Sequence, residues 1–279
     1  MTEARHSPNV TYMQVPQQIE QWFAECPFAI TAFSGGVDSS LVAWLANHFL
    51  GPEKNLAVIS ASPSLKLSDL DEAKDFAREN ALPIRIIETK EMLNPDYVLN
   101  PANRCFFCKQ TLYQELETLA AEFNPCWVLN GTNVDDLGDY RPGLEAARNF
   151  EVRSPLAECG LNKKDIRDLA ESLNLSCWNK PAAPCLSSRI PYGQRVTLSK
   201  LRRIEKAEAW LQAAGFDICR VRHEDPFTAR VEVDADRVSE LPDIQNRLET
   251  AFSEMGFESV ILDEEGFVSG KLNRVLKIK

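Results

Sequence analysis

The sequence lacks long apolar runs, and no window approaches the roughly 18 apolar residues that would span a bilayer. Its first ten residues, MTEARHSPNV, are polar and lack the apolar centre of a secretion signal. Positive charge is also scarce, because 31 lysines and arginines stand against 41 aspartates and glutamates, for a net charge of −10. Such a chain repels a phosphate backbone unless its basic residues gather on one face. We therefore expect a soluble, cytoplasmic protein that binds neither a membrane nor nucleic acid.

Two common nucleotide-binding patterns are missing from the stretch AFSGGVDSSLV, residues 32–42, which has neither a G-K-[ST] ending nor G-x-G-x-x-G spacing. An apolar run ends at Phe33, a Ser-Gly-Gly turn follows, and a helical pattern then begins. This order brings unpaired backbone N–H groups and the positive end of a helix dipole to one point, which attracts a phosphate. Asp38 could help to hold a magnesium ion there. The residues expected to bind ATP phosphates are Ser34, Gly35, Gly36, Val37, Asp38 and Ser39.

Short apolar runs alternate with helical periodicity through the first two thirds of the chain. Strands are expected at 28–33, 56–61, 84–87 and 126–130. Helices are expected at 39–50, 68–80, 108–123 and 163–173. Ser68 followed by Asp71 predicts a capping box, and Asn162 is expected to cap the helix that follows it. The alternation predicts an α/β fold with a parallel sheet that is covered on both faces.

A proline-rich segment, NKPAAPCLSSRIPYGQRVT at 179–197, interrupts this pattern and is either a linker or a loop that forms a site. Beyond it, the pattern predicts helices at 199–214 and 236–254 and strands near 217–222, 228–233 and 257–262. That order indicates a small α+β domain. The predicted division is an ATP domain at 1–178, a connection at 179–198, and a substrate-binding domain at 199–279.

Eight cysteines are scattered through a chain that is 44% hydrophobic and does not need covalent staples, so thiols, metal ligands or catalysts are expected. Cys105 and Cys108 form a Cys-x-x-Cys pair, which can chelate a metal or cluster, form a redox disulfide, or have a purely structural role. Cys185 lies in the proline-rich segment just before Arg189, a cation that would lower the pKa of its thiol. Four others are expected to be small buried residues: Cys26, Cys126, Cys159 and Cys219.

Four motifs occur in an order that resembles the LarE family of the pyrophosphatase-loop ATPases. They are AFSGGVDSSLV, GTNVDDLGDYRPG (131–143), CLSSRIPYG (185–193) and AEAWLQAAGFDICRVR (207–222). Members of this family are ATP-dependent sulfur transferases that build the nickel-pincer cofactor of lactate racemase. The resemblance extends from about residue 28 to the end of the chain.

The resemblance implies a reaction on a small molecule, pyridinium-3,5-biscarboxylic acid mononucleotide. ATP would adenylate a carboxylate, and sulfur would then replace an oxygen to give a thiocarboxylate. Cys185 occupies the position of the sulfur donor, which in single-cysteine members loses its sulfur and becomes dehydroalanine. Arg220 and Arg222 match residues that hold the substrate phosphate, and Glu208 matches an acidic residue that orients a metal or acts as a base. A homo-oligomer is also expected.

Cys105 and Cys108 depart from the single-cysteine pattern, and with Cys185 they resemble the branch that carries a 4Fe-4S cluster on three cysteines. One open iron could then bind a sulfide and spare the cysteine. A zinc site would normally need a fourth protein ligand, which Cys177 could supply. Two residues of the 131–143 loop, Asp136 and Asp139, are further candidates for contacts with AMP or magnesium.

Two other classes of function stay open at this point. One is a different pyrophosphatase-loop enzyme, such as a transfer-RNA thiolase, although the acidic balance and the lack of an added basic domain disfavour it. The other is a regulator that binds nucleotide or metal without catalysis. Release of pyrophosphate from ATP would separate an enzyme from a regulator.

Overall fold

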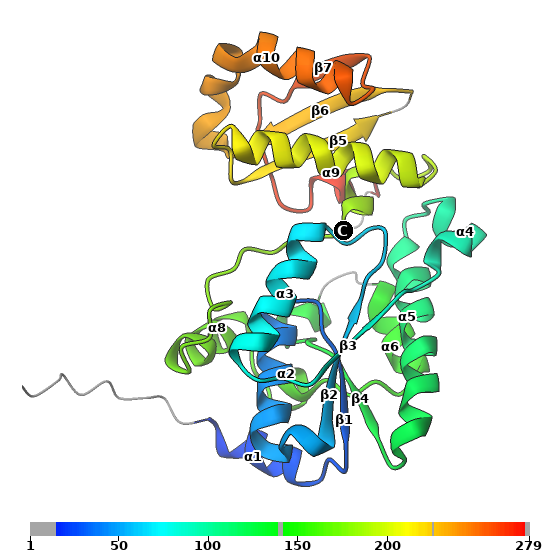
Figure 1. Cartoon of the computed structure of the whole chain (residues 1–279), viewed down its shortest axis with the longest axis vertical. Helices are drawn as coiled ribbons and strands as arrows, with labels where there is room; N and C mark the ends of the chain where they lie inside the picture. The colour runs from blue at the N-terminus through cyan, green and yellow to red at the C-terminus, as the bar shows by residue number, and fades with distance from the viewer. Residues whose placement is uncertain (1–14, 139–141, 225, 277–279) are drawn as a thin grey trace, which may run out of the picture.

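The fold contains two sheets that lie one above the other in an elongated molecule (Figure 1). The computed structural model describes residues 15–138, 142–224 and 226–276. No helix within these ranges has the length and the apolar character needed to cross a bilayer. The first unit contains α1 (Gln17–Ala24), β1 (Ala29–Ala32), α2 (Val37–Leu50), β2 (Asn55–Ser60), α3 (Leu67–Glu79), β3 (Ile84–Ile87), α4 (Pro95–Val98), α5 (Arg104–Ala120), β4 (Trp127–Leu129), α6 (Pro142–Asn149), α7 (Pro155–Glu158) and α8 (Lys163–Ser172). The second contains α9 (Leu198–Ala213), β5 (Cys219–Glu224), β6 (Thr228–Val233), α10 (Leu241–Glu254) and β7 (Ser259–Leu262).

The first sheet is parallel throughout, in the order β3-β2-β1-β4. Its central strand β1 is fully buried, as expected of a parallel strand with helices on both faces. Side chains of α1, α2, α3 and α8 share one core cluster, whereas α5 and α6 pack on the opposite face (Figure 1). The predicted α/β fold with a doubly covered parallel sheet is therefore confirmed.

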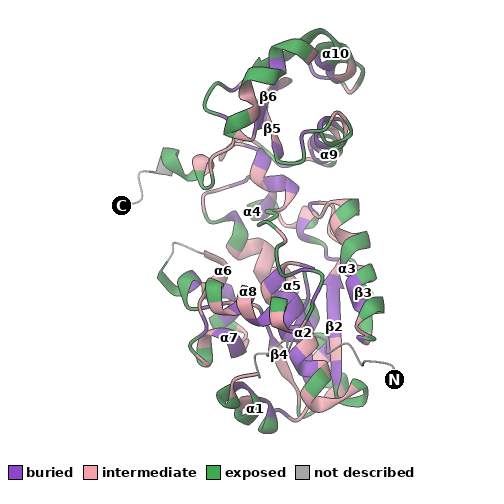
Figure 2. Cartoon of the chain, turned by 90° about the vertical axis from the view of Figure 1, so that its left-hand side faces the viewer, coloured by how far each residue is buried: buried purple, intermediate pink, exposed green. Residues whose placement is uncertain are grey.

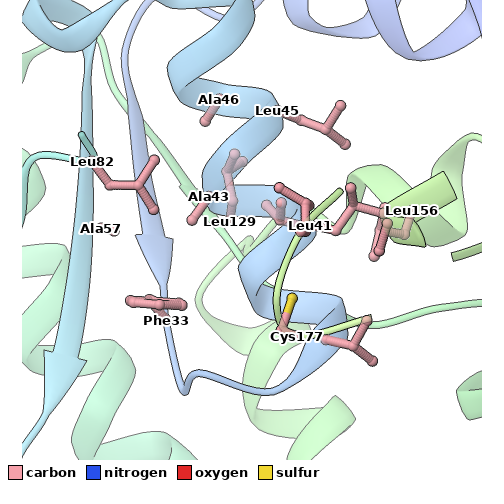
Figure 3. Packing of buried hydrophobic residues seen from close by; sticks show 14 of the residues in the cluster. Phe33, Leu41, Ala43, Leu45, Ala46, Ala57, Leu82, Leu129, Leu156 and Cys177 are labelled. Atoms are coloured by element: carbon pink, nitrogen blue, oxygen red, sulfur yellow. The ribbon is translucent and has the colours of Figure 1, made fainter. Parts of the chain in front are cut away.

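Helix α2 is buried around much of its surface because it lies between the sheet and the outer helices α1 and α8. Leu41 and Leu45 are completely buried, and Figure 3 shows them within the same cluster as Leu129 and Leu156. Complete burial of one such leucine contributes about 1.5–3 kcal/mol. This packing fixes the first turn of α2, which contains the last of the predicted phosphate-binding residues 34–39, against the rest of the core.

The second sheet has the order β5-β6-β7, in which β5 and β6 are antiparallel and β6 and β7 are parallel. Burial alternates along β5, so Cys219, Val221 and His223 face the core under α9 and α10. Arg220 and Arg222 therefore face the other side of the sheet. The colouring in Figure 2 shows buried residues concentrated where helices meet strands in both units.

The two predicted helix caps had different outcomes. Asn162 does cap α8, in a capping box with Asp165. The capping box predicted for Ser68 and Asp71 was wrong, because α3 begins at Leu67 and its start has no side-chain cap of its own. A carboxylate from α9 takes this role instead, since the Leu67 N–H donates to Glu205 Oε1 at 2.7 Å. A contact between the two units thus replaces a local cap.

Candidate active site

The phosphate loop, residues 34–39, closes on itself between β1 and α2. Ser39 Oγ accepts the Ser34 N–H at 3.1 Å, lies 2.9 Å from Ser34 Oγ, and donates to the Gly36 carbonyl at 3.1 Å. Gly35 has a φ of +73°, and a Cβ added there would lie 2.9 Å from Ala73 Cβ on α3. Only glycine fits this position without strain. The loop is therefore held in one conformation at the positive end of the α2 dipole, as an anion site requires.

The segment after β4 packs directly on this loop. A Cβ at Gly131 would lie 2.6 Å from the Ser39 nitrogen and 2.9 Å from the Asp38 carbonyl carbon. Asp136, which is buried, accepts the Asn133 N–H at 3.2 Å and donates its own N–H to Asn133 Oδ1. Asp139, the other acidic candidate in this segment, lies outside the described residues. The turn places the Asp136 carboxylate in the wall of the same cavity as Asp38.

Lys163 is a site residue that the sequence did not reveal. Its Nζ lies 2.7 Å from both carboxylate oxygens of Asp38, 125 residues earlier in the chain. The lysine is the first residue of α8, directly after the capping residue Asn162. A G-K-[ST] loop carries its lysine within the motif, but here a separate helix supplies it. No local pattern signals such a contact.

The segment that carries Cys185 folds back over the start of α5. The buried Asn100 side chain donates to three carbonyls of this segment, those of Ile190, Pro191 and Gln194, at 2.7–3.2 Å. Two further hydrogen bonds hold the same segment at Ser187. The Ser187 carbonyl accepts from Arg104 at 2.9 Å, and the Ser187 hydroxyl lies 2.6 Å from the Tyr97 hydroxyl. The proline-rich segment is thus a loop held against the start of α5 and not a free linker.

This fold-back brings Cys185 close enough to Cys105 and Cys108 to raise the pKa of both thiols. Burial raises the pKa of Cys108 to about 12, and the neighbouring charges of Cys185 and Glu91 act in the same direction. The residue Cys105 as a whole is exposed, but the protein around its sulfur partly excludes water and raises the pKa of this thiol, with an opposing effect from the Arg104 guanidinium and a further increase from Cys185. Such thiols lose their protons most readily when a metal takes the proton's place.

The three thiols remain free, and Cys105 is exposed while the other two are half-buried. Within the described ranges, no group of three or more histidine, cysteine, aspartate or glutamate side chains is arranged to hold a metal ion. Cys177, the candidate fourth zinc ligand, is buried in the core beside α2 (Figure 3). Cys26 and Cys219 are buried as expected, whereas Cys126 and Cys159 are half-buried.

Glu208 is completely buried at the junction of the two units. Its carboxylate accepts from Arg189 at 2.8 Å and from the Val221 N–H at 3.0 Å, and it pairs with Lys66 at 2.5 Å. Burial alone would raise the pKa of Glu208, but the charges of Arg189 and Lys66 outweigh it and lower the pKa. The carboxylate joins α9, the Cys185 loop and the start of α3. Its predicted role as a base or metal-orienting group stays a prediction.

Arg220 and Arg222 lie side by side on β5 but have different partners. Arg222 forms a two-point ion pair with the buried Glu232, at 3.1 and 2.8 Å, and donates to the Ser188 carbonyl at 2.8 Å. Within the part of the chain that the structure describes, Arg220 donates to two carbonyls, those of Cys219 at 2.7 Å and Ala182 at 3.3 Å. Burial and the nearby charge of Arg189 lower the pKa of Arg220. An anion bound beside Arg220 would offset both effects.

One cavity of about 590 Å³ joins these elements. Its walls include Ser34, Asp38 and Ser39 from the phosphate loop, and Cys105 from the start of α5. Arg220 and Arg222 complete it from the second unit. Cavities of this size hold ligands as large as nucleotides. The structure thus gathers predicted phosphate-binding, cysteine and arginine residues around one space.

A parallel sheet that ends in a closed Ser-Gly-Gly loop, with an aspartate at its centre and a large cavity above it, defines an ATP-using enzyme of the pyrophosphatase-loop class. Residues 12–98 match the NAD synthase family. A protein of Lactiplantibacillus plantarum, named pyridinium-3,5-bisthiocarboxylic acid mononucleotide synthase, is 35% identical over 246 residues, which cover 88% of each chain. The chain belongs to the family of this synthase, the LarE family, and is an ATP-dependent sulfur transferase.

Two further relatives, both uncharacterised proteins, match most of the chain. One, from Synechocystis sp., is 43% identical over 262 residues, covering 93% of this chain and 97% of the relative. The other, from Methanocaldococcus jannaschii, is 28% identical over 236 residues, covering 85% of this chain and 89% of the relative. Both similarities therefore extend over the two units of the fold.

Proposed function

We propose that this enzyme adenylates a carboxylate of pyridinium-3,5-biscarboxylic acid mononucleotide and replaces one oxygen with sulfur, for assembly of the nickel-pincer cofactor of lactate racemase. The cavity shared by the phosphate loop, Cys105 and Arg220 supports this function. A carboxylate oxygen would attack the α-phosphorus of ATP, and pyrophosphate would leave. A sulfur nucleophile would then attack the acyl carbon, and AMP would leave. Family membership favours this activity over a transfer-RNA thiolase or a regulator.

On the ATP side, the backbone N–H groups of residues 34–39 would bind the phosphates. Asp38 and Asp136, which line the same cavity, are the carboxylates that would hold a magnesium ion. When a cation binds to Asp38, Lys163 would lose its partner and could pair with the departing pyrophosphate. The ion pair seen here therefore keeps a positive charge ready beside the loop.

On the substrate side, a phosphate monoester would bind Arg220, whose hydrogen-bond partners among the described residues are carbonyls, and Arg222 next to it. Residues 1–178 would thus bind ATP, residues 199–279 would bind the mononucleotide, and the connection at 179–198 would carry Cys185 between them. A homo-oligomer remains a prediction.

We further propose that Cys105, Cys108 and Cys185 hold a 4Fe-4S cluster. Three free thiols support this donor set, because Cys185 lies near enough to raise the pKa of both Cys105 and Cys108, and Cys105 lines the cavity. The loop would have to bring the three sulfurs closer together around a cluster, since the described side chains are not arranged as a metal site here. Thiolates suit iron-sulfur clusters, and three of them leave one iron open. When bound, the cluster would supply an iron that holds sulfur for transfer. The peptide would then orient Cys185 as a ligand, through the hydrogen bonds that Asn100 and Arg104 make to its loop.

The experiment is anaerobic reconstitution of the wild-type protein and of three variants, Cys105→Ala, Cys108→Ala and Cys185→Ala. Each variant should lose most of the iron and acid-labile sulfide that the wild type binds. Cys126→Ala is the matched control, because this half-buried thiol lies next to β4, and it should keep them. With added sulfide, ATP and the dicarboxylate mononucleotide, turnover should exceed one sulfur per chain.

Mass spectrometry of the used protein separates the two possible sulfur sources. Cys185 should remain intact if the cysteines are ligands. A loss of about 34 Da at Cys185 would match conversion to dehydroalanine and would place the chain with the sacrificial members. That result would overturn the cluster as the sulfur source but leave the adenylation proposal intact.

A further inference from the structure

The segment 266–273, here called the C-terminal segment, follows β7 and forms part of the cavity wall. It is fixed at both ends. The Phe267 N–H donates to the Val233 carbonyl at 2.7 Å, and Asn273 Oδ1 accepts from the Tyr192 hydroxyl at 3.0 Å. Between these points, Lys271 Nζ lies 2.7 Å from Asp263 Oδ1. No sequence motif drew attention to this segment.

Gly266 determines how the segment enters the cavity wall. Its φ is +72°, a conformation that favours glycine, and a Cβ there would lie 2.7 Å from the Val233 oxygen and 3.0 Å from Ala235 Cα. The backbone therefore packs tightly on the end of β6. This contact fixes the position of the next residue, Phe267.

Phe267 provides an aromatic surface for Arg220. The guanidinium carbon of Arg220 lies 4.8 Å from the centroid of the Phe267 ring, within the range of a cation–π contact. Among the described residues, no carboxylate forms an ion pair with Arg220, whereas Arg222 pairs with Glu232. Two carbonyls and one ring thus hold the Arg220 guanidinium. None of these neutral partners cancels its charge.

We propose that Phe267 is a positioning residue for Arg220, holding the guanidinium ready for the phosphate monoester of the mononucleotide substrate. The inference rests on the proposed function, since that function supplies the phosphate. A ring under the guanidinium restricts its rotation but leaves the N–H donors at its edge free for an anion. This pre-orientation reduces the entropy lost when the anion binds. An aliphatic residue of similar volume would fill the space without attracting the cation.

The test compares Phe267→Leu with Phe267→Trp, a substitution that retains an aromatic face. The probe is nicotinic acid mononucleotide, a pyridinium mononucleotide, with binding measured by calorimetry. Phe267→Leu should weaken its affinity about tenfold, in line with a cation–π contact in a partly desolvated site, and Phe267→Trp should restore most of it. In turnover assays, Phe267→Leu should raise the KM for the dicarboxylate mononucleotide and leave kcat and ATP affinity unchanged.

A matched control exists in the same unit, where the guanidinium carbon of Arg237 lies 4.4 Å from the centroid of the Phe216 ring. Neither residue lines the cavity. Phe216→Leu should leave mononucleotide affinity unchanged. Wild-type affinity in Phe267→Leu, or an equal loss in Phe267→Leu and Phe267→Trp, would overturn the positioning role.

Inorganic phosphate serves as a second probe that keeps this inference separate from the proposed function. If the wild type binds phosphate but not nicotinic acid mononucleotide, the proposed substrate class, a pyridinium mononucleotide, is wrong. The positioning role then stands if Phe267→Leu weakens phosphate binding, and it fails if phosphate binding is unchanged. A wild type that binds neither probe would overturn both.

Discussion

The phosphate loop spans six consecutive residues, whereas the site around Cys105, Cys108 and Cys185, here called the cysteine site, joins residues that are far apart in the chain. In the loop, Ser34 and Ser39 hydrogen-bond to each other, and Ser39 also donates to the Gly36 carbonyl. At the cysteine site, Arg104 reaches the carbonyl of Ser187, 83 residues later. A local motif carries its own geometry, so its function can be read from sequence. The second kind of site depends on residues such as Asn100 that have no chemical role of their own.

The largest expected effect on activity comes from a change beside the phosphate loop, the local site of this comparison. Gly131→Ala would place a methyl group 2.6 Å from the Ser39 nitrogen and would displace the phosphate loop. A misplacement of about 1 Å can cost a hundredfold in rate, so ATP-dependent pyrophosphate release should fall by about that factor. Pyrophosphate release with saturating ATP and substrate is the measurement.

Gly51→Ala is the control, because Gly51 ends the same helix α2 and has no atoms near its missing Cβ. Its φ of +77° makes alanine cost about 1–2 kcal/mol in stability. Its pyrophosphate release should nevertheless be unchanged. Equal loss of activity in both variants would show that helix stability, and not loop geometry, limits the reaction.

Local patterns predicted much of the fold. The β3 strand, for example, occupies the expected residues, and the Asn162 cap formed as the pattern indicates. The Ser68 cap failed because Glu205, from the other unit, bonds the first N–H of α3. The same limit explains why the contacts of Lys163 and Phe267 were missed, since both act on residues far away in the chain. Long-range contacts depend on packing, which short patterns do not record.

Among the long-range contacts, the largest expected effect is on stability and comes from Glu208. Glu208→Gln would leave the buried Arg189 and the nearby Lys66 without their counter-charge. Removal of one partner from a buried ion pair typically costs about 3–5 kcal/mol. Urea denaturation at pH 7 should show a loss of this order in the free energy of unfolding.

The pH dependence gives a second check on Glu208. Because its pKa is lowered in the folded state, its contribution is full above the unfolded pKa of about 4.3 and disappears as the pH falls through the folded value. The stability difference between wild type and Glu208→Gln should therefore shrink below about pH 4. Glu240→Gln removes an exposed partner of Arg237 and should change stability little at any pH. A pH-independent difference for Glu208→Gln would contradict an ionised, paired carboxylate.

The smallest expected effect concerns Lys163, where a distant residue completes the local loop. Lys163→Ala removes the cation that contacts both oxygens of Asp38 and should lower pyrophosphate release about tenfold to a hundredfold, as expected for a charged hydrogen bond. Lys164→Ala is the matched control, because the amine of Lys164, the next residue, is exposed and pairs with Asp168 on the same helix. It should leave the rate unchanged, and Lys163→Arg should recover part of it. Equal rates in the two alanine variants would mean that the phosphate loop works with its own six residues alone.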